Sequence, residues 1–302
     1  METLTIHKLA DWRSSEIYVL REDLLPFACG GNKARISAQL IADAKSKGAD
    51  VIVGYGNCRS NLCRALAMLC ARERMDCTII SPSDGDGGRK ETANSRIVRI
   101  CGAKVVPCEK GAGVAAVVEK VMSDLSAAGR TPYYVFGSSK GEGNETVLAS
   151  TYEEVAAKIS AWERREGISF DRIAVAVGTG STYAGLLNGF HSLSRSLPVT
   201  GFTIAREKGV CLKALARFTR LPADIRDNAL AGGYGRTSAE QARFLAEILT
   251  RHAILFDPVY SGKALWGLHD QILSGTMLNE RILFVHTGSL PLAIDGLEVM
   301  DG

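Results

Sequence analysis

The sequence predicts an α/β protein built on parallel β-sheets. Short apolar runs typical of strands recur along the chain, and segments with helical spacing of apolar residues fill the intervals between them. Runs such as 51–54 and 173–177 are apolar throughout, as expected of parallel strands buried on both faces. The length of 302 residues, with 46% hydrophobic and 23% charged residues, suits two domains or one large α/β unit.

The alternation of elements can be followed in order along the chain. We expect strands at 17–20, 51–54, 77–80, 104–107, 133–136, 173–177, 199–204 and 282–285. We expect helices at 60–74, 89–100, 112–128, 145–166, 182–194, 208–219, 238–251 and 262–274, after a first helix that contains Ile36, Leu40 and Ala44. Such alternation implies sheets with helices on both faces.

One break in the pattern indicates how the domains are arranged. The glycine-rich stretch 137–144 precedes a long polar helix, which is typical of a boundary between domains. We therefore expect a larger domain of residues 1–47 and 150–302, into which a smaller α/β domain of residues 48–149 is inserted. Catalytic loops would then face the cleft between the two.

Composition excludes several classes of function. The net charge of +3 is spread along the chain with no basic, aromatic-rich stripe, which argues against a nucleic-acid partner. We expect no membrane partner and a cytoplasmic location, because the sequence contains no apolar run of about 18 residues and no signal peptide. Most of the eight cysteines should be free thiols, and neither they nor the five histidines have the spacing of metal ligands.

Lys33 is the first candidate for a reactive group. It follows Gly30, Gly31 and Asn32, which permit a tight turn, and it lies at or just before the N-terminus of the first helix. Burial and the partial positive charge of a helix N-terminus both disfavour a charged amine, so Lys33 is suited to form a Schiff base. An ordinary surface lysine after a turn remains the alternative.

A second motif provides a site for an anion. Residues 177–185, with the letters VGTGSTYAG, follow an apolar strand and open a helix, so backbone N–H groups and hydroxyls converge at the helix N-terminus. No acidic residue ends the next strand and no Gly-Lys-Ser/Thr follows, which favours one phosphate over a dinucleotide or a P-loop ligand. A glycine turn that serves only strand–helix packing is the alternative.

A Schiff-base lysine together with a site for one phosphate indicates pyridoxal 5'-phosphate, whose aldehyde and phosphate lie on different sides of one ring. Six motifs then occur in the order found in one enzyme family: Gly30-Gly31-Asn32-Lys33, Ser60-Asn61, Gly178-Thr179-Gly180-Ser181-Thr182, Gly233-Tyr234-Gly235, Asp257-Pro258-Val259-Tyr260-Ser261-Gly262-Lys263 and His286-Thr287-Gly288. From about residue 15 to 295 the chain resembles the 1-aminocyclopropane-1-carboxylate deaminase and D-cysteine desulfhydrase family of fold-type II pyridoxal-phosphate enzymes. That family has two open, twisted, mostly parallel sheets.

The resemblance implies a role for each matching residue. Lys33 would hold the cofactor and take the substrate Cα proton, while residues 178–182 would bind the phosphate and Thr287 would also contact the cofactor. Asn61 would hydrogen-bond the cofactor 3'-oxygen. Ser60 would meet the substrate carboxylate, although a serine that caps the following helix would explain this position as well.

The resemblance also assigns Tyr260, Tyr234 and Ser261. The two tyrosines match two active-site tyrosines of the family, one of which would flank the substrate and move protons; from the residues alone, a buried aromatic with one satisfied hydroxyl is the commoner explanation of each. Ser261 would face the pyridine nitrogen, where cyclopropane-opening members have glutamate and desulfhydrase-like members have threonine. Because a hydroxyl holds that nitrogen protonated less well than a carboxylate does, the ring is a weaker electron sink. This favours α,β-elimination to pyruvate and ammonia over ring opening.

Three positions depart from the family pattern. Arg59 replaces the glutamine that usually precedes Ser60, and it could pair with an additional acidic group on the substrate or be solvated. Leu62 replaces a polar residue after Asn61, and Ser289 replaces a second glycine after Gly288.

The leading hypothesis is a pyridoxal-phosphate lyase that acts on a small β-substituted, D-cysteine-like amino acid. The alternatives are a β-replacement synthase, an aminocyclopropane-carboxylate-type deaminase, a non-catalytic relative that keeps the cofactor, and a phosphate-ligand-binding protein without it. A homodimer is expected from the resemblance.

Overall fold

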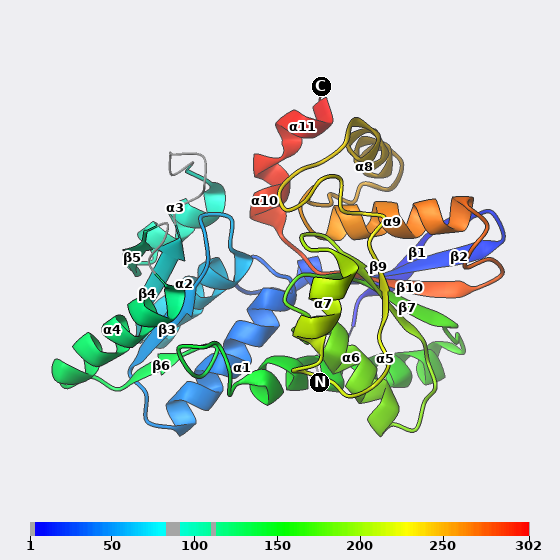
Figure 1. Ribbon diagram of the computed structural model, residues 1–302. Coiled ribbons are helices and arrows are strands. Elements are labelled where there is room, and N and C mark those ends of the chain that lie inside the picture. Colours follow the sequence, from blue (N-terminus) through cyan, green and yellow to red (C-terminus); the bar gives the residue numbers. More distant parts are fainter. Residues whose placement is uncertain (1–3, 83–90, 110–112, 302) are drawn as a thin grey trace. The chain divides into compact units, whose positions relative to one another are not determined.

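The computed structural model describes residues 4–82, 91–109 and 113–301, so positions 89, 90 and 112 of two predicted helices lie outside the described residues. The chain divides into two compact units (Figure 1). The first contains Met1–Asn32 and Ala149–Gly302, and the second contains Lys33–Leu148. Residues 33–47, which the sequence analysis placed in the larger domain, make their contacts in the second unit.

The first unit is built on a six-stranded sheet. Its order is β1 (Ile6–Trp12), β2 (Ser15–Arg21), β10 (Arg281–His286), β7 (Arg172–Val177), β8 (Val199–Thr203) and β9 (Asp224–Arg226). Only the β1–β2 pair is antiparallel; the other four pairs are parallel. Every residue of β8 is buried, as are five of the six in β7, which explains why both segments are apolar.

Helices cover both faces of this sheet, as Figure 1 shows. On one face lie α8 (Ala239–His252) and α9 (Ser261–Leu273), and on the other lie α6 (Ser181–Ser192) and most of α5 (Glu145–Glu166). The core between α9, α8 and the sheet includes Phe202, Phe256 and Phe284, each buried. The remaining helices of the unit are η1 (Glu22–Leu24), α7 (Lys208–Leu215), α10 (Leu290–Asp295) and α11 (Leu297–Asp301).

The second unit has a four-stranded, fully parallel sheet. Its order is β5 (Lys104–Cys108), β4 (Asp76–Pro82), β3 (Val51–Tyr55) and β6 (Pro132–Tyr134). The unit also contains α1 (Asn32–Ser46), α2 (Asn61–Glu73), α3 (Ala93–Ile100) and α4 (Val114–Ala127). Val118 and Val121 of α4 pack on Val51, Val53 and Ile80 of the sheet, so one face of the sheet is covered by α4.

The predicted α/β architecture is confirmed, and each predicted strand and helix corresponds to an observed element. Two strands were not predicted. β1 buries only Leu9 and mixes polar with apolar side chains at the sheet edge, so it has no apolar run, and β9 has only three residues. The short helices α10 and α11 were also not predicted, and α7 ends at Leu215 rather than at 219.

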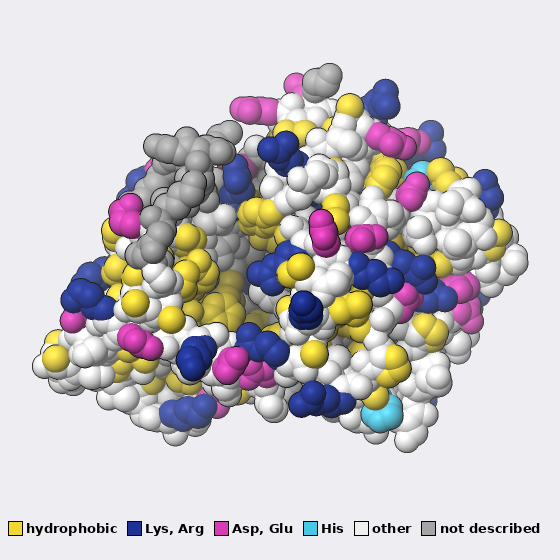
Figure 2. Space-filling model, viewed as in Figure 1, with side chains coloured by type: hydrophobic (Ala, Val, Ile, Leu, Met, Phe, Trp, Pro, Cys, Tyr) yellow, Lys and Arg dark blue, Asp and Glu magenta, His cyan; other side chains and the backbone are white. Residues whose placement is uncertain are grey.

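Charged side chains of both signs lie interspersed on the face shown in Figure 2. No described helix combines the length and the apolar character that crossing a bilayer requires. All eight cysteines are free thiols, as predicted for most of them.

Candidate active site

The loop before Lys33 has an unusual backbone. Residues 28–31 have positive φ angles of 47°, 54°, 65° and 87° in order. The first two are Ala28 and Cys29, for which a left-handed conformation costs on the order of 1–2 kcal/mol each. At Gly31 a side chain is excluded because a Cβ atom would lie 2.5 Å from the carbonyl oxygen of Thr287. Such strain persists only where the surrounding structure fixes the backbone, and it is typical of functional sites.

Asn32 connects this loop to two other predicted motifs of the first unit. Its backbone N–H donates to the Thr287 carbonyl oxygen at 3.0 Å, and its side-chain Nδ2 donates to Thr182 Oγ1 at 2.9 Å. Because Thr182 Oγ1 accepts this bond, its own proton is directed elsewhere and can be donated to a ligand. Sequence reasoning quoted Asn32 as part of the motif but gave it no role.

Lys33 is the second residue of α1, as expected. The residue as a whole is half-buried, but its amine lies away from water, and this burial lowers the pKa of Lys33 to about 8. Within the described part of the chain, no group forms a hydrogen bond or ion pair with the amine. A desolvated amine without a protein partner is suited to attack a carbonyl.

The loop Gly178–Thr182, which the sequence analysis predicts to bind an anion, joins β7 to α6. Gly180 has a φ of 100°, and a Cβ there would lie 2.6 Å from the Leu215 side chain, so the turn requires glycine. Ser181 and Thr182 are buried. In the part of the chain that is described, no protein group accepts from the N–H groups of residues 179–181. These donors and hydroxyls at a helix N-terminus fit one phosphate.

Ser261 has a buried acidic neighbour that sequence reasoning missed. Its hydroxyl donates to Asp257 Oδ2 at 2.6 Å, and its N–H donates to the same oxygen at 3.0 Å. Asp257 Oδ1 accepts from the N–H groups of Val259 and Tyr260 at 2.9 and 2.5 Å. Burial raises the pKa of Asp257, whereas these four bonds oppose that shift. The carboxyl group of Asp257 therefore fixes the orientation of the Ser261 hydroxyl.

The two predicted tyrosines lie together in the first unit. The hydroxyl oxygens of Tyr234 and Tyr260 are 2.8 Å apart, and their rings meet edge to face. A Cβ on Gly178 would lie 3.9 Å from the Tyr260 ring, so this ring is next to the anion site. The structure thus places a pair of hydroxyl groups beside the loop that fits a phosphate.

A second lysine supports the loop that carries Tyr234. Lys263 is wholly buried, and its amine donates to the carbonyl oxygens of Gly233 and Leu230 at 2.7 and 3.0 Å. Burial lowers the pKa of Lys263 to about 8, whereas the charge of Asp257 acts in the opposite direction. Sequence reasoning quoted Lys263 within a motif without a role.

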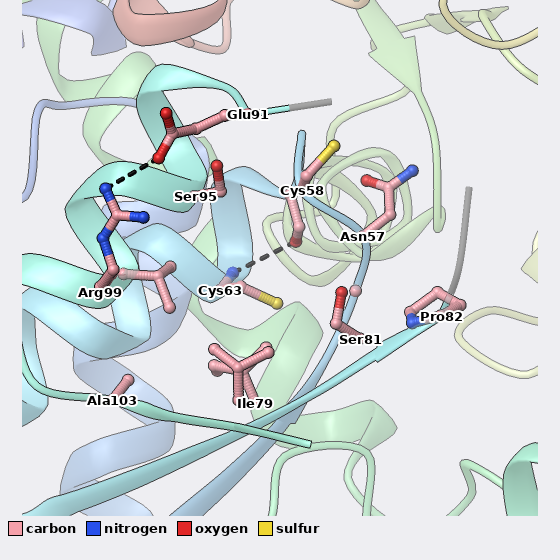
Figure 3. A pocket seen from close by; sticks show the side chains of 14 residues that line it. Asn57, Cys58, Cys63, Ile79, Ser81, Pro82, Glu91, Ser95, Arg99 and Ala103 are labelled. Carbon is pink, nitrogen blue, oxygen red and sulfur yellow. Dashed lines mark hydrogen bonds and ion pairs between the residues drawn. The ribbon is translucent and has the colours of Figure 1, made fainter. Parts of the chain in front are cut away.

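Residues 57–61, here called the Ser60 loop, belong to the second unit. Ser60 caps α2, and its Oγ accepts from the Cys63 N–H at 3.2 Å, which confirms the capping role. Together with Asn57 and Cys58, Ser60 borders a cavity of about 450 Å³ that extends between α2, α3 and β4 (Figure 3). Glu91 and Arg99 form an ion pair of 2.8 Å at this cavity.

Two residues at the start of α3 donate hydrogen bonds to the Ser60 loop. Thr92 Oγ1 donates to the Cys58 carbonyl oxygen at 2.5 Å. Asn94 Nδ2 donates to the Arg59 carbonyl oxygen at 3.0 Å and to Asn61 Oδ1 at 2.9 Å. Neither Thr92 nor Asn94 was expected to contribute to the site.

His286 is a core residue. It is buried and stacked on Phe256 with ring centroids 4.0 Å apart, and burial lowers its pKa to about 4. The Gly288 N–H donates to Nδ1, so the remaining ring nitrogen donates to the Leu255 carbonyl oxygen at 3.2 Å. Ser289, the departure from glycine, has a φ of 87°, a conformation that glycine adopts without strain.

The predicted site residues thus fall into two groups. The first unit brings together Tyr234, Tyr260, Ser261, Thr287 and the loop Gly178–Thr182. The second unit contains Lys33, Arg59, Ser60, Asn61 and Leu62. Asn32, the last residue of the first unit, bonds to Thr182 and Thr287 and is covalently joined to Lys33.

Two mostly parallel sheets, an amine without a partner among the described residues and a loop that fits one phosphate are features expected of a pyridoxal-phosphate protein. The residues fit this cofactor in two respects. The N–H groups of residues 179–181 have no acceptor among the described residues, and Lys33 directly follows Asn32, whose side chain bonds Thr182. Residues 2–288 match the family model described as pyridoxal-phosphate dependent enzyme. The chain therefore belongs to the pyridoxal-phosphate dependent enzyme family.

Similar proteins narrow the comparison within this family. The chain is 31% identical to a D-cysteine desulfhydrase of Serratia proteamaculans (strain 568), with 95% of this chain and 90% of that protein covered. It is 32% identical to a D-cysteine desulfhydrase of Klebsiella pneumoniae (strain 342), with 94% and 90% covered.

Solved structures agree on the fold. A crystal structure of an ACC deaminase homologue superposes with a TM-score of 0.87 at 26% identity, covering 100% of this chain and 94% of that one. An O-ureido-L-serine synthase superposes with a TM-score of 0.69 at 16% identity over 99% and 92%, a similarity of fold alone.

Proposed function

We propose that this enzyme catalyses α,β-elimination on a small β-substituted amino acid, as a D-cysteine desulfhydrase does. The observation that carries the proposal is the combination of a desolvated Lys33 amine, which has no partner among the described residues, and a hydroxyl, rather than a carboxylate, at Ser261. The similarity to two D-cysteine desulfhydrases over most of both chains supports the same reaction.

Each proposed role follows from a local geometry. When bound, pyridoxal phosphate supplies an electron sink for the negative charge that develops at the substrate Cα. Lys33 would hold the cofactor covalently and, once the substrate amine has displaced it, would accept the Cα proton, which its lowered pKa permits near neutral pH. The loop Gly178–Thr182 binds the phosphate through free N–H groups and the Thr182 hydroxyl.

Four further residues would bind, orient or protonate the reactants. Ser261 and Asn61 would help to hold the cofactor, at the pyridine nitrogen and at the 3'-oxygen respectively. Ser60 binds the substrate carboxylate at the N-terminus of α2, where the helix dipole favours an anion. The Tyr260 hydroxyl, hydrogen-bonded to that of Tyr234, holds a proton that can move to the leaving group.

The reaction balances without an oxidant or reductant. The Cα–H bond breaks and its proton goes to Lys33. The bond from Cβ to its substituent breaks, and the substituent leaves with the electron pair and takes up a proton. One water then hydrolyses the enamine that is left, giving pyruvate and ammonia.

Arg59 bears on which substrates are accepted. It is half-buried beside Ser60, and no acidic side chain in the described ranges pairs with it. We propose that it pairs with an additional acidic group on the substrate, because arginine binds carboxylates and sulfonates through paired donors. Leu62, which is buried, gives this part of the site an apolar wall.

β-Replacement is the second candidate, since the fold is shared with O-ureido-L-serine synthase. The two reactions differ in the fate of the three-carbon unit, which becomes pyruvate in elimination and a new amino acid in replacement. Cyclopropane ring opening is disfavoured by the absence of a carboxylate at position 261. We also propose a homodimer that works in the cytoplasm, which light scattering and cell fractionation would test.

The function is tested by a keto-acid release assay. D-cysteine, L-cysteine, chloroalanine, cysteate, serine and aminocyclopropane carboxylate are compared, with and without an added thiol. Elimination predicts that one enantiomer of cysteine or chloroalanine releases pyruvate and that the added thiol does not suppress this release. Consumption of the substrate to a thioether without pyruvate would instead establish β-replacement, and rapid turnover of the cyclopropane substrate would contradict the argument from Ser261.

A further inference from the structure

The amide of Asn94 lies in a position that determines how Asn61 is oriented. Asn94 is 1% exposed, and it is the second residue of α3. Its Nδ2 donates to the Arg59 carbonyl oxygen at 3.0 Å and to Asn61 Oδ1 at 2.9 Å, and all three residues belong to the second unit. One buried amide therefore contacts two residues of the Ser60 loop.

These contacts fix which atoms of the two amides face each other. A backbone carbonyl oxygen can only accept, so the atom of Asn94 that contacts Arg59 must be the donor Nδ2. The same Nδ2 contacts Asn61, so the Asn61 atom that faces it must be the acceptor Oδ1. The NH2 group of Asn61 is consequently on the side of its amide that points away from Asn94.

Asn94 destabilises the folded state through one of its atoms, which a residue with only a structural role would not be expected to do. Among the described residues, its buried Oδ1 has no hydrogen-bond partner. A buried acceptor without a partner is destabilising, and native structures contain few of them. The second polar contact of the same helix start, from Thr92 to the Cys58 carbonyl oxygen, already holds the loop. The donor group of Asn94 therefore has a function beyond joining α3 to the loop.

We infer that Asn94 is a positioning residue that orients the Asn61 amide so that its NH2 group is presented to the cofactor 3'-oxygen. This inference rests on the proposed role of Asn61. An oxygen that carries negative charge requires a donor, and an amide rotated by 180° would present an acceptor instead. Asn94 prevents that rotation, because a rotated Asn61 would place its own NH2 against Nδ2.

The test uses Asn94→Leu, which keeps a similar shape and adds no charge, in the full-length enzyme. Pyridoxal phosphate is titrated into the apoenzyme, and we expect about tenfold weaker binding because one charge-assisted hydrogen bond is lost. The pH midpoint of the visible absorbance of the loaded enzyme should rise, because an oxygen without a donor is more basic. Ser95→Ala is the matched control, since it removes a hydrogen bond at the same helix start without touching Asn61. It should change neither quantity.

A double-mutant cycle with Asn61→Ala separates orientation from general loosening of the loop. In the Asn61→Ala background, Asn94→Leu should have less than about a twofold effect on cofactor affinity. An equal loss in both backgrounds, or unchanged affinity and midpoint in Asn94→Leu alone, would overturn the inference. If Asn61→Ala itself binds the cofactor normally, the proposed role of Asn61 fails as well.

The thermal stability of each apoenzyme shows whether the variants fold. Should Asn94→Leu fail to fold, Asn94→Ala takes its place in the same cycle, with an expected loss of about threefold in affinity. Equal affinity of Asn94→Ala and the wild type would then overturn the inference.

Discussion

The enzyme buries two lysine amines, and their surroundings differ. Lys33, at the start of α1 in the second unit, has no hydrogen-bond or ionic partner among the residues described. Lys263, in α9 of the first unit, donates to the carbonyl oxygens of Gly233 and Leu230 and makes a longer contact of 3.4 Å with that of Ile204. Burial lowers the pKa of each to about 8.

The comparison shows that a lowered pKa alone does not identify the reactive lysine. Both amines are desolvated, but the lone pair of Lys263 would be released only by breaking hydrogen bonds that hold the loop before Tyr234. Lys33 would break none. The amine that we propose as reactive, that of Lys33, is therefore distinguished by having no acceptor around it among the described residues, and Lys263 serves as an internal control for Lys33.

Replacing the reactive lysine should have the largest effect. Lys33→Ala removes both the covalent attachment of the cofactor and the proton acceptor, so we expect turnover to fall at least about 10⁴-fold. The visible absorbance of the loaded enzyme should also disappear. Steady-state pyruvate release and an absorbance spectrum measure these effects. Turnover within about tenfold of the wild type would show that another amine performs the reaction.

Lys263→Met should act mainly on stability. It leaves at least two part-buried carbonyl groups without a donor and Asp257 without a nearby positive charge, so we expect a loss of about 3 kcal/mol in unfolding free energy. Urea unfolding of the apoenzyme measures this loss. The loaded variant should still show the visible band. Disappearance of the band in a folded Lys263→Met protein would remove the distinction between the two lysines.

The pH dependence of stability separates the lysines further. Folding lowers the pKa of Lys33 from 10.5 to about 8, so between these values the unfolded chain binds more protons and stability rises with pH. Lys33→Met should lack this contribution. At pH 7 its apoenzyme should be more stable than the wild type by about 1 kcal/mol, a value reduced to allow for a half-exposed side chain. If the unfolding free energies of the wild type and of Lys33→Met are equal both at pH 7 and at pH 9.5, the predicted contribution of Lys33 is contradicted.

Tyr234→Phe should have the smallest effect. It removes the hydroxyl that bonds Tyr260 but leaves the loop held by Lys263, so stability should stay within about 0.5 kcal/mol of the wild type. Turnover should fall about three- to tenfold, because the Tyr260 hydroxyl loses its partner. Introducing Tyr234→Phe into the Lys263→Met variant tests whether Lys263 supports Tyr234. If it does, Tyr234→Phe should lower turnover less in Lys263→Met than in the wild type.

Local patterns predicted the parts of the site that depend on local structure. The turn before Lys33, the Ser60 cap and the glycine loop after β7 each follow from neighbouring residues, and each is present as predicted. Asp257 was missed, although its distance of four residues from Ser261 is the kind of signal that could have found it.

Contacts between distant parts of the chain could not be predicted. Asn94 reaches Asn61 across 33 residues and Lys263 reaches Gly233 across 30, so neither pairing has a signature in a local window. Asn32 bonds to Thr182 across 150 residues. The motifs identified which residues matter, whereas the hydrogen bonds that position them required the folded structure.

Borohydride reduction of the loaded enzyme, followed by peptide mass spectrometry, tests the central claim most directly. The reaction fixes a phosphopyridoxyl group to whichever amine held the cofactor. We predict that the added mass is found on the peptide that contains Lys33 and is absent from the peptide that contains Lys263. Modification of Lys263, or of neither lysine, would contradict the account.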